Sequence, residues 1–162
     1  MTKEISIEDE NFTTFVKDIK TKILSSQYEA LKAVNKELIN LYWEIGKNIV
    51  EKQELFGWGK SVVQNLSHEL QKEFVGMKGF SVQNLWNMRY FYLEYHENEK
   101  LQTLSREIGW SHNIAIFQKT KDELEREFYI KMVIKFGWTY RVLDNHIDNK
   151  SYEKYLLNQT NF

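Results

Sequence analysis

Apolar residues recur every three or four positions along most of the chain, which is the spacing of an amphipathic α-helix. This spacing predicts a short helix over residues 11–24 and a long helix from a cap at Ser25 or Ser26 to about Glu54. Further helices are predicted at 60–74, 81–96, 101–108 and 121–136, and another after Thr139. A short helix that ends at Gln118 is also predicted. Proline is absent and most glycines lie between these stretches, so we predict an all-α fold, a helical bundle with a long central helix.

The long predicted helix carries a heptad-like apolar seam. Its members alternate in steps of three and four: Leu31, Val34, Leu38, Leu41 and Ile45. A helix with such a seam needs a partner helix along its length. The sequence leaves two alternatives open, because the seam can pack inside the same chain or join two chains in a homodimer.

Residues 60–96 have the outline of a helix-turn-helix, with the glycine-bearing turn VGMKG between two helices and Ser81 as the cap of the second. On a helical wheel one arc of this second helix is apolar and faces the core. The opposite arc carries Gln83, Asn84, Asn87, Tyr90 and Glu94. Carboxamides can read adenine in a major groove, so we expect DNA contact from Gln83, Asn84, Asn87 and Tyr90, with an ordinary solvated face as the alternative.

Charge permits only a local contact with nucleic acid. The 22 Lys and Arg residues are balanced by 23 Asp and Glu residues, for a net charge of -1. Two stretches are locally basic, 60–93 and 128–141. From these stretches we expect phosphate contacts by Lys78, Lys131, Lys135 and Arg141, although lysines one turn apart are also common on any solvated helix. Arg89 falls within the apolar arc, so we expect it to form an ion pair, with Glu44 as the partner.

The sequence shows no sign of a catalytic centre. Cysteine is absent, the four histidines lack metal-ligand spacing, and no P-loop, dinucleotide or nucleophile-elbow pattern occurs. We therefore expect no metal, no cofactor and no enzymatic activity in this chain.

The ends of the chain are polar. Residues 1–10 are expected to be disordered, 11–150 to form the helical domain, and 151–162 to be a linker. The N-terminus lacks the features of a secretory signal and no apolar run could span a membrane, so the expected location is the cytoplasm.

Five sequence blocks together are similar to one family: LYWEIGKNIVEKQ, GWGKSVVQNLSHELQKEF, GFSVQNLWNMRYFYLEY, IGWSHN and EREFYIKMVIKFGWTYRVLDNHI. Over about residues 12–157 they resemble the YhcG N-terminal domain family, domain of unknown function 1016. In that family a helical region with a helix-turn-helix-like or winged-helix-like unit precedes a PD-(D/E)XK nuclease domain. The resemblance implies a non-catalytic module that binds duplex DNA for a C-terminal nuclease domain. The alternative is a protein interaction or dimerisation module without DNA contact.

The resemblance also implies structural signature positions. These are Trp43, Glu44, Arg89, Trp110, His112 and Trp138. His112 follows Trp110 at a predicted turn, where it could be a packed imidazole or a contact to phosphate or to a partner.

Overall fold

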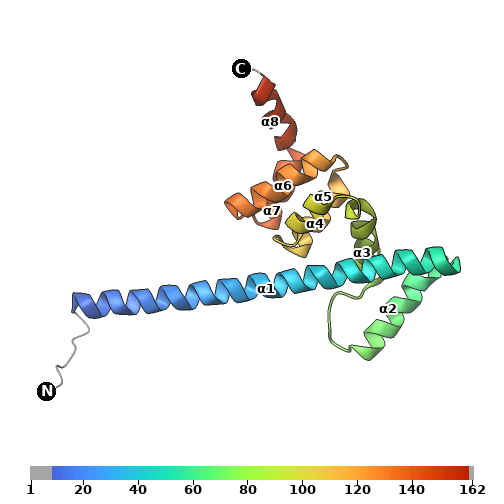
Figure 1. The fold of residues 1–162 in the computed structure, drawn as a ribbon, viewed down its shortest axis with the longest axis horizontal. Helices are drawn as coiled ribbons and strands as arrows, with labels where there is room; N and C mark the ends of the chain where they lie inside the picture. The colour runs from blue at the N-terminus through green and yellow to red at the C-terminus, as the bar shows by residue number, and fades with distance from the viewer. Residues whose placement is uncertain (1–8, 161–162) are drawn as a thin grey trace. The chain divides into compact units, whose positions relative to one another are not determined.

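The computed structural model describes residues 9–160, and every regular element in that range is an α-helix (Figure 1). The all-α prediction is confirmed. Residues 1–8 and 161–162, at the ends of the predicted disordered segment and linker, lie outside the described residues. The helices are α1 (Glu10–Phe56), α2 (Ser61–Glu73), α3 (Val82–Tyr95), α4 (Glu99–Ser105), α5 (Trp110–Lys119), α6 (Glu123–Phe136), α7 (Tyr140–Asp148) and α8 (Ser151–Thr160).

The chain divides into two units, Met1–Val34 and Asn35–Phe162. The described part of the first unit belongs almost entirely to α1, and its large apolar side chains are largely exposed: Phe15, Ile19, Ile23, Leu24, Tyr28, Leu31 and Val34. The second unit holds the hydrophobic core.

The predicted break before the long helix is wrong, because residues 10–56 form one helix. Ser25 and Ser26 are exposed within it. Serine can cap a helix but does not stop one, and neither glycine nor proline occurs between Glu10 and Ile45 to do so.

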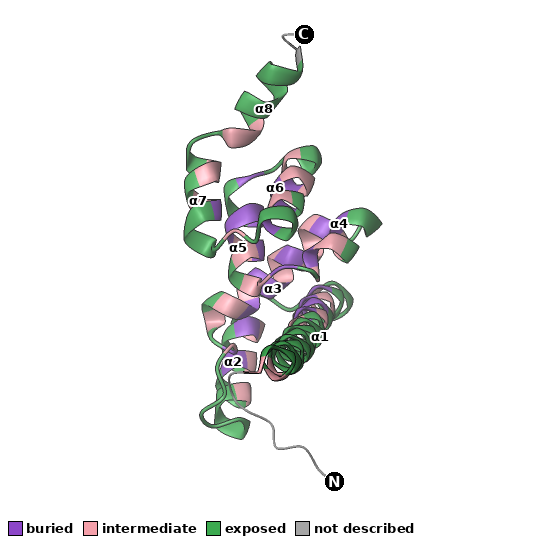
Figure 2. Ribbon diagram, turned by 90° about the vertical axis from the view of Figure 1, so that its left-hand side faces the viewer, coloured by how far each residue is buried: buried purple, intermediate pink, exposed green. Residues whose placement is uncertain are grey.

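Helix α3 is the centre of the second unit. It packs against α2, α4 and α5, and Figure 2 shows it as a mixture of buried and intermediate residues. Its side chains Leu85, Met88, Phe91 and Tyr95 are fully buried. They join two adjacent clusters, one rich in aromatic rings towards α5 and one of smaller side chains towards α2. Helix α3 is therefore packed on more than one side, and most of its other residues are half-buried.

Helix α1 approaches α3 closely at Gly46. A Cβ atom there would collide with the carbonyl group of Met88. Glycine is therefore required for contact between the two backbones. The stripe of α1 that faces the core consists of Ile39, Tyr42, Trp43, Gly46, Ile49 and Val50.

The predicted seam lies on a different stripe of α1. Leu38 and Leu41 of the second unit are exposed, as are Leu31 and Val34 of the first, while Ile45 is half-buried. Packing of the whole seam within the chain, one of the two alternatives from the sequence, is therefore not what the structure shows.

Two later elements also differ from expectation. The segment GWSHN, residues 109–113, was predicted to be a turn, but α5 begins at Trp110. The Asn113 side chain explains the difference, since its Nδ2 donates to the carbonyl oxygens of Gly109 (3.0 Å) and Ser105 (2.9 Å) and ties the start of α5 to the end of α4. Residues 151–160 form helix α8, and their role as a linker stays a prediction.

Candidate nucleic-acid interface

Helices α2 and α3 are joined by an ordered segment, residues 74–81. The Ser67 hydroxyl donates to the Phe80 carbonyl oxygen at 2.7 Å, and Gln71 Nε2 donates to the same oxygen at 3.2 Å. The Ser81 hydroxyl accepts from the Asn84 backbone N–H at 3.1 Å, so the predicted cap of this helix is confirmed. The start of α3 is therefore held in place by side chains of α2 and by its own cap.

Asn84 is bonded inside the domain. Its Nδ2 donates to the Gly79 carbonyl oxygen at 2.7 Å, and its Oδ1 accepts from Trp110 Nε1 at 2.7 Å. The side chain also bonds the Tyr42 phenol, whose pKa is raised by burial. A base contact by Asn84 would require these bonds to break.

Asn87 is buried as well, and its Oδ1 accepts from Gln118 Nε2 at 2.7 Å. Gln83 is exposed and Tyr90 is half-buried against Phe117. The residues of the predicted solvent arc therefore differ in exposure, because α3 is packed on several sides and not on one. Of its three carboxamide residues, only Gln83 is exposed.

Two pockets on the outer side of α3 share the Trp86 ring. One has a volume of about 550 Å³ and is lined by Lys60, Ser61, Gln64, Val82 and Trp86. The other has a volume of about 340 Å³ and is lined by Trp86, Asn87, Arg89, Tyr90 and Gln118. We call these nine residues the Trp86 face. Two of them are basic and none is acidic.

Sequence reasoning missed several members of this face, notably Lys60, Trp86 and Gln118. A signal was available for one of them. Trp86 is three residues after Gln83 and four before Tyr90, so it belongs to the same arc of α3. Because large aromatic residues are usually assigned to the core, Trp86 was not predicted to be a site residue.

The predicted ion pair of Arg89 with Glu44 is wrong. Arg89 Nε donates to Gln53 Oε1 at 2.7 Å, and its guanidinium lies 5.4 Å from the centre of the Trp86 ring. No acidic partner of Arg89 occurs within residues 9–160. The Trp86 face therefore keeps this positive charge.

A second basic region lies on α4 and α6. Lys131 Nζ is 2.8 Å from Glu127 Oε1, and Lys100 pairs with the same carboxylate. These two lysines lower the pKa of Glu127, so one negative charge is shared between two positive ones. Lys135, one turn after Lys131, is exposed over the Phe136 ring.

The predicted phosphate contacts are exposed but dispersed among several elements. Lys78 lies in the segment before α3, and Arg141 lies in the first turn of α7. Neither they nor Lys131 and Lys135 line a pocket of the Trp86 face. Their role in phosphate binding stays a prediction.

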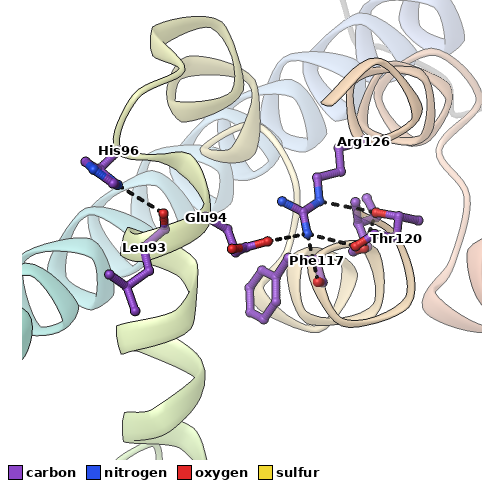
Figure 3. A network of polar contacts seen from close by, with 7 residues as sticks. Leu93, Glu94, His96, Phe117, Thr120 and Arg126 are labelled. Carbon is purple, nitrogen blue, oxygen red and sulfur yellow. Dashed lines mark hydrogen bonds and ion pairs between the residues drawn. The ribbon is translucent and has the colours of Figure 1, made fainter. Parts of the chain in front are cut away.

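A buried polar network around Arg126 is structural (Figure 3). Arg126 is 2% exposed, and its Nη2 donates to Glu94 Oε1 (2.8 Å), the Thr120 carbonyl oxygen (2.7 Å) and the Phe117 carbonyl oxygen (3.1 Å). Glu94, which the helical wheel placed on the solvent arc, is therefore the partner of a buried cation. This arginine holds α3, α5 and α6 together and has no surface to offer a ligand.

His112 is packed, as one of the two interpretations of this residue predicts. Its Nε2 donates to the Trp138 carbonyl oxygen at 2.7 Å. The Trp138 ring in turn stacks on His146, with 3.9 Å between the ring centres. The contact joins α5 to the start of α7.

Two kinds of site are absent from the described range. No group of three or more His, Asp or Glu side chains in residues 9–160 is placed to hold a metal ion. No helix in that range combines the length and apolarity needed to cross a bilayer.

Comparison with known proteins supplies the family. One relative, "Putative nuclease YhcG" of Escherichia coli (strain K12), is 28% identical over 165 residues, which cover 82% of this chain and 44% of the relative. The chain thus spans less than half the length of that protein. No solved structure gives a significant match. The family model for the DUF1016 N-terminal domain matches residues 18–154, and the chain therefore belongs to the DUF1016 N-terminal domain family.

Proposed function

We propose that this chain is a non-catalytic nucleic-acid-binding module of a nuclease, and that the Trp86 face makes the contact. The supporting observation is a face with two basic residues and no acidic one, in a chain where acidic residues outnumber basic ones. Phosphates approach such a surface without repulsion. The nuclease itself is inferred from the name of the relative.

The residues of this face have complementary roles. Lys60 and Arg89 contact phosphates, and the rings of Trp86 and Tyr90 offer planes on which bases stack. Gln83, the exposed carboxamide of α3, lies outside the nine residues of this face and is proposed to reach a base edge as well. Asn84 supports the face through its bond to Trp110.

The proposal predicts binding that is sensitive to salt and to charge on this face. Fluorescence anisotropy with a labelled duplex would be measured for the full chain and for the double variant Lys60→Glu, Arg89→Glu. We expect at least a tenfold loss of affinity and a smaller dependence on salt. The control is Lys17→Glu, Lys20→Glu, which makes the same charge change at exposed positions of the first unit.

Two results would contradict this assignment. If the folded wild-type chain binds no DNA even at low salt, the nucleic-acid role is wrong. If instead Lys131→Glu, Lys135→Glu abolishes binding while the Trp86-face variant does not, the interface belongs to α6.

A second function, dimerisation, is favoured by the exposed apolar surface of α1. Beside it, α1 and α2 form an apolar groove of about 580 Å³. The groove contains the last two seam residues, Leu41 and Ile45, together with Val62, Leu66, Leu70, Phe74, Met77 and other side chains. Contiguous exposed apolar side chains are a common feature of protein interaction sites.

The exposure of the seam favours a second copy as the partner. Its residues recur in alternating steps of three and four, and Leu38 and Leu41 are exposed. Two such helices can pair antiparallel about a two-fold axis, as an isologous dimer requires.

Sedimentation at two protein concentrations tests the dimer. We expect a mass of two chains at the higher concentration, and a monomer for Leu38→Glu, Leu41→Glu. The matched control adds the same two charges to exposed polar positions of α2, in Asn65→Glu, His68→Glu. A wild-type chain that stays monomeric at every concentration removes this function and leaves the nucleic-acid role untouched.

A further inference from the structure

The smaller pocket of the Trp86 face combines two aromatic rings, a guanidinium and two carboxamides. We propose that this pocket binds a single unpaired nucleobase. The inference rests on the proposed nucleic-acid role and states which form of nucleic acid the face selects. Each type of lining group has a part in the binding.

The two carboxamides present a hydrogen-bonding edge. Gln118 Nε2 donates to Asn87 Oδ1 at 2.7 Å. This bond leaves Asn87 Nδ2 as a donor and Gln118 Oε1 as an acceptor, and neither atom bonds another residue in the described part of the chain. Asn87 is only 8% exposed, so the position of its amide is fixed by packing.

A neighbouring donor and acceptor match the Watson–Crick edge of a base, because each base has a donor and an acceptor on that edge. In a duplex this edge is occupied by the opposite base. The carboxamide pair therefore selects bases that have no partner, and it selects weakly among the four.

The aromatic rings bound the same pocket. Tyr90 is supported from behind by Phe117, with 5.5 Å between the ring centres. The Trp86 ring is half-buried and therefore restricted in its motion. A base that leaves its stack can stack again on such rings, with little dependence on its identity.

Arg89 supplies the contact for the phosphate next to that base. Its Nε is used by Gln53, and its two Nη groups make no bond to another residue of the described chain. A guanidinium held at one nitrogen and open at the other two can form a bidentate contact with phosphate. Trp86, Asn87, Arg89 and Tyr90 thus lie within two turns of α3, and Gln118 of α5 completes the pocket.

Fluorescence anisotropy with three labelled probes tests the inference: a single strand, the fully paired duplex, and the same duplex with one unpaired base. We expect the single strand and the interrupted duplex to bind at least tenfold more tightly than the paired duplex. Trp86→Ala should reduce this preference by about five- to a hundredfold. Gln118→Ala should reduce it by a smaller factor.

Controls separate the pocket from the rest of the face. Gln64→Ala alters only the larger pocket and should leave the preference unchanged. Gln118 is exposed, so its variant tests the pocket even if Trp86→Ala fails to fold. As a direct readout, 2-aminopurine at the unpaired position should lose fluorescence on binding to the wild-type chain and not to Trp86→Ala.

The outcomes distinguish this inference from the proposed function. Equal affinity for the three probes would overturn the unpaired-base pocket and keep nucleic-acid binding. Tight binding to the single strand that neither Trp86→Ala nor Gln118→Ala changes would also overturn it. No binding to any probe would defeat both.

Discussion

Helices α1 and α3 are in contact at Gly46, but they differ in which side chains they bury. Some polar side chains of α3 are buried, whereas some apolar side chains of α1 are exposed. In α3, the carboxamide of Asn84 is drawn into the domain and bonded at both its nitrogen and its oxygen. In the second-unit part of α1, the apolar side chains of Leu38 and Leu41 are left in solvent. A helix enclosed by neighbours must satisfy its polar groups internally, whereas a helix packed along one stripe can keep a second apolar stripe for another molecule.

Neighbouring positions on α1 provide the largest contrast. Ile39 is fully buried and Leu38 is 38% exposed. We expect Ile39→Ala to lower the free energy of unfolding by about 3 kcal/mol, because it leaves a cavity, and Leu38→Ala to change it by less than about 0.5 kcal/mol. Chemical denaturation of both variants measures this difference. Similar losses at the two positions would mean that Leu38 is covered in solution.

The contact between the two helices at Gly46 gives an intermediate effect. Gly46→Ala places a methyl group against the Met88 carbonyl, and we expect a loss of about 2 to 3 kcal/mol. The control is Gly59→Ala, where an added Cβ meets no atom within 4 Å. Thermal unfolding of the two variants checks the prediction. A stable Gly46→Ala variant would show that the backbones do not touch.

The carboxamides of α3 give the smallest contrast. Asn84→Ala removes the partner of the Trp110 indole and of the Gly79 carbonyl, and we expect a loss of about 1 to 2 kcal/mol. Gln83→Ala, one residue earlier and exposed, should be neutral within about 0.5 kcal/mol. If Asn84→Ala is equally neutral in thermal unfolding, the amide belongs to the surface and regains its predicted role toward bases.

Periodicity was sufficient for the fold class and for several of the helices. The stripes at 60–74, 81–96 and 121–136 became α2, α3 and α6 with small shifts at their ends. Periodicity was insufficient wherever a long-range bond decided the outcome. The start of α5 depends on Asn113 reaching Ser105, which no local pattern reveals.

The site was only partly predictable for the same reason. A helical wheel assigns a single core face to α3, so it placed Gln83, Asn84 and Asn87 together on the solvent arc. It could not anticipate that Trp110 and Gln118, each more than 20 residues later, would bond two of these amides. The pairing of Arg89 with Gln53 instead of Glu44 likewise depends on how α1 lies against α3.

The glycine at position 46 has a consequence for insertions and deletions. With no side chain between the backbones, residues 35–56 cannot turn about the helix axis without a collision. The direction in which each of these side chains projects is thus set by how many residues separate it from position 46. One residue inserted between Leu41 and Gly46 would swing Leu38 and Leu41 around the axis by about 100°. A change in chain length there would reorient the apolar surface without altering its composition.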